Sequence, residues 1–352
     1  MRSRIRTALI FLLTFGLLAF FLRHADMAAV WGETRRARPL LLLGAVGITA
    51  MTYALRAFRW QYLLAPLGAV RFSTAFRATV IGFAATFLLP ARAGEVIRPY
   101  LLARREGLPA SAAFATIILE RLLDLVTVLG LFTVFVLTLD PASLPGVDPA
   151  YLARVKLGGV LAGAAAGGGL LVAFVAAGHP ERLGRWALQV ERVLPERLAR
   201  TVAQFVESFT QGLAVMRQPG RLFVSLVLSV PLWLLIAAGI WLTSLAFHIT
   251  FAYMGSFLVM TLLVVGVAMP TPGAVGGFHA AYQIGVQTFF GAPDDRAIGA
   301  AIVLHAISFL PVTALGIVFM AREGLTLARA RTLATDSPPA APPGDSLVRH
   351  PR

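Results

Sequence analysis

The chain has 352 residues, 58% of them hydrophobic and 14% charged, and a net charge of +14. So few charges cannot cover the surface of a soluble globule of this size, and a disordered chain would be far less apolar. The chain has no cysteine, which excludes disulfide frameworks, zinc–thiolate sites and cysteine-bound iron–sulfur clusters. We therefore predict an all-α polytopic membrane protein.

The first part of the chain contains two apolar runs and one interrupted run. Residues 7–22 follow a basic arm and predict an uncleaved signal anchor, because no small-x-small cleavage site follows them. Residues 24–38 have the pattern of an interfacial amphipathic helix, and residues 39–64 that of a second span. Residues 75–89 are too short and too interrupted by glycine for a comfortable crossing. They lead into a polar stretch at 90–98 that no lipid-facing helix would tolerate.

The middle of the chain alternates apolar and polar segments. Residues 109–139 form a long helical stretch with three charged residues inside it, and a span rich in Gly and Ala follows and ends near residue 177. Residues 179–220 are polar with amphipathic spacing, which predicts helices lying on the membrane surface. Residues 221–248 form the next span.

The last part repeats the interrupted pattern. An apolar run at 251–269 is broken by a Pro- and Gly-rich motif at 270–277, and a short helix at 280–290 follows. The last span is predicted at 297–320. The tail at 335–352 is rich in Pro and Ala and is predicted to be disordered.

The elements together predict about six transmembrane helices and two re-entrant hairpins broken by Pro and Gly, at 75–105 and 251–291. Residues 1–334 would form one membrane domain, with 335–352 as the disordered tail. Two interrupted hairpins, each followed by a full span, suggest an inverted repeat, which is a recurring plan of transporters.

Loop charge predicts the orientation. Arginine-rich loops place the N-terminus, the amphipathic segment at 179–220 and the C-terminus in the cytoplasm, at the inner membrane. The first hairpin would then dip in from the cytoplasm and the second from outside. The loop at 23–38, with four arginines on the predicted outer side, is the exception.

The arginines themselves leave two interpretations open. Of the 31 lysines and arginines, all except Lys156 are arginines. The excess of arginine can reflect a nucleotide composition that favours arginine codons, together with the usual basic charge of cytoplasmic loops. Alternatively, some arginines bind lipid phosphates with their planar guanidinium groups. Nucleic acid is not expected as a partner, because the arginines are spread between apolar spans rather than gathered on one face with aromatic residues.

Charged residues inside the apolar stretch at 109–139 mark a candidate site. Glu120 and Asp124 are four residues apart, so both carboxylates lie on one helix face and repel each other unless a cation or a proton lies between them. Arg92, Arg98 and Arg121 are candidate partners. Either a buried ion-pair network that braces the hairpin or a site for a headgroup or a proton fits this pattern.

Four motifs, in this order, resemble the flippase-like membrane domain of lysylphosphatidylglycerol synthases. They are Arg56-x-x-Arg59-Trp60, Pro90-x-Arg92-x-Gly94-Glu95-x-x-Arg98, Glu120-Arg121-x-x-Asp124 and Pro270-x-Pro272-Gly273-x-x-Gly276. The resemblance covers roughly residues 1–325, leaves no room after it for a synthase domain, and implies a stand-alone module for lipid translocation. The candidate residues for headgroup binding and transport are Arg56, Arg59, Arg92, Glu95, Arg98, Glu120, Arg121, Asp124, Pro272, Gly273, Gly276, His279 and His305.

Two histidines depart from the family pattern. Many members carry a glutamate after the second Pro-Gly motif, where this chain has His279, and His305 follows in the last span. Ordinary membrane-interior histidines or a pH-responsive pair both fit. Neither a metal nor a cofactor is expected, because no His-x-x-His or Glu-x-x-His spacing accompanies them.

The leading hypothesis is a protein that moves an anionic or polyisoprenoid-linked lipid between the leaflets of the inner membrane. One alternative is a membrane-embedded enzyme that modifies headgroups with Glu120 or His305 as base. Another is a scaffold for lipid or cell-envelope synthesis. An enzyme is not expected, because no set of nucleophile, base and orienting residue stands out. Membrane lipid is the expected partner, with a homodimer or a lipid-synthesis protein as further possibilities.

Overall fold

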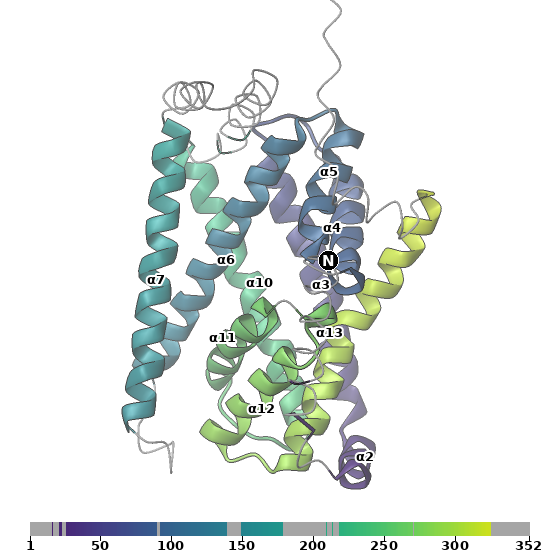
Figure 1. Cartoon of the computed structure of the whole chain (residues 1–352), viewed down its shortest axis with the longest axis vertical. Coiled ribbons are helices and arrows are strands. Elements are labelled where there is room, and N and C mark those ends of the chain that lie inside the picture. The colour runs from purple at the N-terminus through teal and green to yellow at the C-terminus, as the bar shows by residue number, and fades with distance from the viewer. Residues whose placement is uncertain are drawn as a thin grey trace, which may run out of the picture.

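The computed structural model describes residues 26–89, 92–138, 149–178, 218–269 and 271–324, together with Gly16, Phe21, Leu22, Phe209 and Leu213. These residues form a bundle of helices (Figure 1). Most of the predicted signal anchor at 7–22, most of the surface segment at 179–220 and the whole tail at 335–352 lie outside the described residues.

In the described part of the chain, four helices are long and apolar enough to cross a membrane. They are α3 (Pro39–Leu64), α6 (Ala110–Thr138), α10 (Pro219–Ala246) and α13 (Asp294–Arg322). All four were predicted as spans. The predicted Gly- and Ala-rich span is the long helix α7 (Pro149–Gly178), which packs against α6 at one edge of the bundle (Figure 1).

The outer surface of the long helices is apolar. Leu40 on α3 and Leu137 on α6 are 80% and 79% exposed. Only 22–39% of the most apolar window of each spanning helix is buried inside the protein. Because soluble proteins rarely expose apolar surface on this scale, these faces contact lipid chains. The prediction of a polytopic membrane protein is confirmed.

Two pairs of shorter helices form hairpins. The first hairpin joins α4 (Phe72–Leu88) to α5 (Gly94–Glu106), and the second joins α11 (Gly255–Ala268) to α12 (Gly277–Phe290). None of the four has more than 17 residues, so at about 1.5 Å per residue none can cross a hydrocarbon core of about 30 Å. Both hairpins were predicted from their Pro and Gly interruptions.

The hairpins enter the bundle from opposite ends, and their tips lie about halfway along it (Figure 1). There the turn η5 (Pro272–Ala274) at the tip of the second hairpin packs against α4. An ion pair closes the outer end of the first hairpin. Arg71 before α4 pairs with Glu106 at the end of α5 at 3.3 Å, which confirms that the first hairpin returns to the end where it began.

The two halves of the bundle have the same plan. Helices α3 to α6 and helices α10 to α13 each consist of a span, a hairpin and a second span. Their packing is reciprocal: α4 lies against α13 and α11 against α6, while α3 and α10 pair with each other. This exchange of partners is what an inverted repeat produces, so the predicted repeat is present in the fold.

Glycines let the helices of each hairpin touch near its tip. A Cβ atom on Gly94 of α5 would collide with the carbonyl oxygen of Gly82 and the side chain of Thr86 on α4. A Cβ atom on Gly277 of α12 would likewise lie 2.5 Å from the carbonyl oxygen of Gly266 on α11. Because only glycine permits this approach, the two halves use the same device at matching places.

The short helix α2 (Met27–Arg36) lies at one end of the bundle (Figure 1). It buries Val30 and leaves Met27 and Trp31 more than half exposed, as expected for an amphipathic helix at an interface. Its Glu33 pairs with Arg296 of α13 at 2.9 Å. The helix is therefore fixed to the last span.

Candidate functional site

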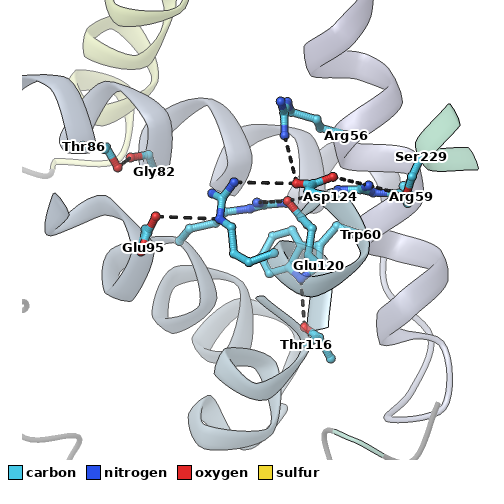
Figure 2. A network of polar contacts seen from close by, with 12 residues as sticks. Arg56, Arg59, Trp60, Gly82, Thr86, Glu95, Thr116, Glu120, Asp124 and Ser229 are labelled. Carbon is cyan, nitrogen blue, oxygen red and sulfur yellow. Dashed lines mark hydrogen bonds and ion pairs between the residues drawn. The ribbon is translucent and has the colours of Figure 1, made fainter. Parts of the chain in front are cut away.

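Charged side chains from α3, α5, α6 and the turn before α5 meet at the tip of the first hairpin (Figure 2). Within the described residues this cluster contains five arginines and three carboxylates, so its positive charges are two in excess. Its members are Arg56, Arg59, Arg92, Glu95, Arg98, Glu120, Arg121 and Asp124. The structure thus brings together eight of the thirteen residues that the sequence nominates.

The inner layer of the cluster consists of Arg59, Arg98, Glu120 and Asp124, none more than 4% exposed. Arg98 donates two hydrogen bonds to Glu120, at 3.0 and 3.1 Å. Arg59 lies between the two acids, 2.6 Å from Asp124 and 3.5 Å from Glu120. The repulsion between the two carboxylates, four residues apart on α6, is therefore offset by a guanidinium from α3.

Neutral side chains complete the inner layer. Trp233 on α10 donates its indole N–H to Asp124 at 2.9 Å, and the hydroxyl of Ser229 accepts from Arg59 at 2.5 Å. The guanidinium of Arg98 lies 4.0 Å from the centroid of the Trp60 ring. Sequence reasoning missed Ser229 and Trp233. Their signal was the i, i+4, i+8 spacing of Ser225, Ser229 and Trp233, which puts one polar stripe on an apolar helix.

The outer layer consists of Arg56, Arg92, Glu95 and Arg121, and its contacts are looser. Arg92 pairs with Glu95 at 2.8 Å, but Glu95 and Arg121 are 3.7 Å apart. Arg121 and Arg56 approach the remaining oxygen of Asp124 only to 3.7 and 3.6 Å. Within the described residues the Arg56 Nη1 and Arg121 Nε atoms are buried and have no hydrogen-bond partner. Such N–H groups can donate hydrogen bonds to a bound anion.

Arg92 sits where the chain turns at the hairpin tip. Its φ angle is 55°, in the left-handed region that non-glycine residues rarely adopt. Such a conformation costs on the order of 1–3 kcal/mol and persists where surrounding contacts impose it. Here it places the guanidinium against Glu95, at the edge of the outer layer.

A cavity of about 400 Å³ lies beside the outer layer, between the two halves of the bundle. This volume falls within the range of about 300–1,000 Å³ that is typical of ligand sites. The charged part of its wall consists of Arg56, Arg92, Glu95, Arg121 and Asp124. Most of the rest is apolar and comes largely from α10, α11 and α13, including Ile236, Ile240, Met260, Leu263, Val264, Val267, Leu304 and Ile307. The cavity therefore has a cationic end and an apolar end.

The remaining nominated residues form a separate group at the second hairpin. Gly273 adopts φ 63° in η5, and its carbonyl oxygen lies 2.8 Å from Nε2 of His305. The ring of His305 stacks on that of His279 at 4.6 Å, and Nδ1 of His279 accepts the backbone N–H of Gly276 at 3.4 Å. Pro272 begins the same turn. This group holds the tip of the second hairpin against α13.

The histidines stay apart from the charged cluster. In the described wall of the cavity, Phe278 and Phe309 take part and the two histidines do not. The described residues also contain no group of three His, Asp or Glu side chains that could hold a metal ion.

The fold and the site define a polytopic helical membrane protein with inverted hairpins and a charged cluster halfway across. Comparison with known proteins identifies the family. Residues 7–316 match the family described as the lysylphosphatidylglycerol synthase TM region. The chain therefore belongs to this family, as its four motifs indicate.

Two relatives show how the region occurs elsewhere. The chain is 31% identical over 157 residues to the glycosyltransferase AglD of Haloferax volcanii, a match that covers 44% of this chain but only 24% of AglD. It is 24% identical over 308 residues to a UPF0104 membrane protein of Methanothermobacter thermautotrophicus, covering 80% of this chain and 85% of that protein. The second match supports a stand-alone membrane domain.

Proposed function

We propose that this protein translocates an anionic or polyisoprenoid-linked lipid between the leaflets of the cell membrane. The observation that carries the proposal is the two-ended cavity, with arginine N–H groups that lack a hydrogen-bond partner at one end and an apolar wall at the other. A lipid has the same two-ended chemistry. Its phosphate would lie against Arg56 and Arg121, and its chains would follow the apolar wall toward the bilayer.

The two layers of the cluster have different roles in this proposal. The inner layer braces the first hairpin, because each of its acids is held by a buried arginine at 3.1 Å or less. The outer layer binds the headgroup, because the ion pairs of Arg56 and Arg121 are 3.6 and 3.7 Å long and both guanidinium groups line the cavity. Charge-assisted contacts from planar guanidinium groups suit a phosphate. The proposal therefore combines the two interpretations of the sequence: a bracing ion-pair network for the inner layer and a headgroup site for the outer layer.

The same proposal assigns orientation and partners. The termini and the outer ends of the first hairpin face the cytoplasm, and the lipid itself is the partner. No chemical conversion of the lipid takes part. Because the chain has no cysteine, single cysteines can be introduced at will. Cysteines at 71 and 104 should both label from the cytoplasm, and a cysteine at 294 only from outside. Labels on opposite faces for 71 and 104 would contradict a re-entrant first hairpin.

The direct test is lipid movement in liposomes. Purified protein is reconstituted with phosphatidylglycerol that carries a fluorescent acyl chain, and a membrane-impermeant quencher is added outside. Wild type should expose the inner-leaflet pool, and extraction should recover the lipid unchanged. Arg121→Gln should slow exposure at least 10-fold, because it removes a cavity donor, while Arg104→Gln, exposed at the far end of the first hairpin, should match wild type.

Other outcomes would contradict translocation. Exposure no faster than in protein-free liposomes, with well-folded protein, would favour the scaffold. Conversion of the headgroup would favour the enzyme. Equal loss in Arg104→Gln and Arg121→Gln would show that the effect does not come from the cavity.

A further inference from the structure

One side of the cavity is lined with hydroxyl groups. Thr49, Thr52, Tyr53 and Arg56 of α3 all contribute to its wall. Their spacing of i, i+3, i+4 and i+7 places them on one face of the helix. The hydroxyl row, defined as Thr49, Thr52 and Tyr53, therefore continues directly from the cationic end, and Thr86 of α4 adds a further hydroxyl to the wall.

The hydrogens of these hydroxyl groups are already committed to backbone carbonyl oxygens. Thr49 donates to Ala45 at 2.8 Å and Thr52 to Thr49 at 2.7 Å. Tyr53 donates across to Ser308 on α13 at 3.1 Å. A hydroxyl group has one donor and two acceptor lone pairs, so what the row offers to a ligand is acceptors. The free oxygens of a phosphodiester carry no hydrogen and cannot donate to these acceptors.

The ligand group beside the row must therefore be a donor, and its charge can be inferred from the wall. The three arginines of the described wall outnumber its two acids by one, which matches a phosphodiester monoanion. An ammonium group next to Arg56 would be repelled by it. The acid Glu95 is already paired with Arg92 at 2.8 Å. A neutral hydroxyl group donates without these costs.

We infer that the hydroxyl row is a headgroup subsite that selects lipid phosphates esterified to a neutral polyol, such as a glycerol or a cyclic polyol. This inference rests on the proposed function for the placement of the phosphate at Arg56 and Arg121. It adds that the group beyond the phosphate donates hydrogen bonds to Thr49, Thr52 and Tyr53. A lipid with a bare phosphate has no group beyond the phosphate, and a choline headgroup has no hydroxyl donor.

The test compares headgroups on one acyl-chain probe. Phosphatidylglycerol, phosphatidylinositol, phosphatidic acid and phosphatidylcholine with the same fluorescent acyl chain are assayed for movement in liposomes. Short-chain forms of the four lipids are assayed for binding to detergent-solubilised protein. The variants are Thr52→Val and Thr49→Val, which replace a hydroxyl by a methyl group of similar size. Thr127→Val is the matched control, because Thr127 is buried, donates to Leu123 at 2.8 Å and does not line the described cavity.

We expect the wild-type protein to bind the two polyol lipids more tightly than the other two lipids and to move them faster. Each cavity variant should reduce this preference about 3- to 10-fold, the effect of losing one neutral hydrogen bond. Thr127→Val should keep it. Whichever of phosphatidylglycerol and phosphatidylinositol binds more tightly shows whether the open-chain or the cyclic polyol is the better ligand.

Three results would overturn the inference. These are equal binding of all four headgroups, a preference for the bare phosphate or choline, and a polyol preference that survives both cavity variants. Failure of translocation is a separate result, because the binding assay needs no transport. Polyol-selective binding that depends on Thr52, without lipid movement, would leave the subsite standing and remove the translocation proposal.

Discussion

The two hairpins share a backbone plan and differ in almost every functional side chain. Each has two short helices, a tip broken by Pro and Gly, and a contact between glycines. The tip of the first hairpin is surrounded by the charged cluster and fixed by the bidentate pair of Arg98 and Glu120. The tip of the second is surrounded by aromatic rings and held by the contact of His305 with Gly273 at 2.8 Å.

This difference shows how a repeated fold divides its tasks. Glu120 is the eleventh residue of α6 and His305 the twelfth residue of α13, so each lies at nearly the same depth of its span. One half keeps an acid there that anchors a network of charges. The other half keeps a histidine and supplies apolar wall from α11 to the cavity. The charged side chains gather at the tip of the first hairpin, and the second hairpin supplies apolar wall to the cavity beside them.

The largest expected effect comes from breaking the inner layer. Glu120→Gln leaves Arg98 without its buried charge partner and leaves Arg59 with Asp124 alone. Removing one partner of a buried ion pair costs about 3–5 kcal/mol of stability. Thermal unfolding of the detergent-solubilised protein should show a large drop in melting temperature. Glu95→Gln is the control, because its side chain is 31% exposed and it belongs to the outer layer.

If Glu95→Gln destabilised the protein as much as Glu120→Gln, the distinction between the two layers would be wrong. If neither did, the inner layer would not brace the hairpin.

The next effect tests what the hairpins share. Gly94→Ala and Gly277→Ala each place a methyl group against the backbone of the facing helix. Overpacking of this kind costs about 1–3 kcal/mol, and the two variants should lose comparable melting temperature. Gly158→Ala on α7 has open space at its Cβ position and should not destabilise. A large loss in only one hairpin would argue against matched packing in the two halves.

The smallest effect concerns the second hairpin alone. His305→Phe keeps an aromatic ring but removes the contact with the Gly273 carbonyl oxygen. The loss of one neutral hydrogen bond predicts about 0.5–1.5 kcal/mol, well below the effect of Glu120→Gln. His305→Gln retains a donor and should restore part of the melting temperature. A loss as large as that of Glu120→Gln would show that both tips are fixed equally firmly.

The sequence was sufficient for the hairpins and for nominating the charged members of the cluster, but it did not separate them from the five residues at the second hairpin. Helices too short for a span and breaks at Pro and Gly are local features, and so is the four-residue spacing of Glu120 and Asp124. The segments Ala115-Thr-Ile-Ile-Leu-Glu120 and Ala300-Ala-Ile-Val-Leu-His305 are similar apolar strings, which alone are weak evidence for a repeat. In the fold, both segments lie in the span that follows a hairpin.

Only part of the pairing within the cluster could be predicted. Arg98 was a candidate partner of the two acids and does pair with Glu120, whereas the central position of Arg59 was not foreseen. Arg59 lies between Glu120 and Asp124, although it comes from a helix more than sixty residues earlier. Arg121, next to Glu120 in sequence, points to the outer layer because adjacent residues on a helix face different directions. Trp233 was hidden in an apolar run. Partner choice depends on how three helices cross, and that is set by packing over the whole bundle.

The meeting of the hairpin tips halfway along the bundle has an electrical consequence. Moving one elementary charge across a membrane is worth about 2.3 kcal/mol for each 100 mV of potential. An anion bound at the charged cluster has traversed roughly half of that field, so each half of a crossing carries about half of this energy. The transfer of a charged headgroup through this site should therefore depend on voltage in two nearly equal steps.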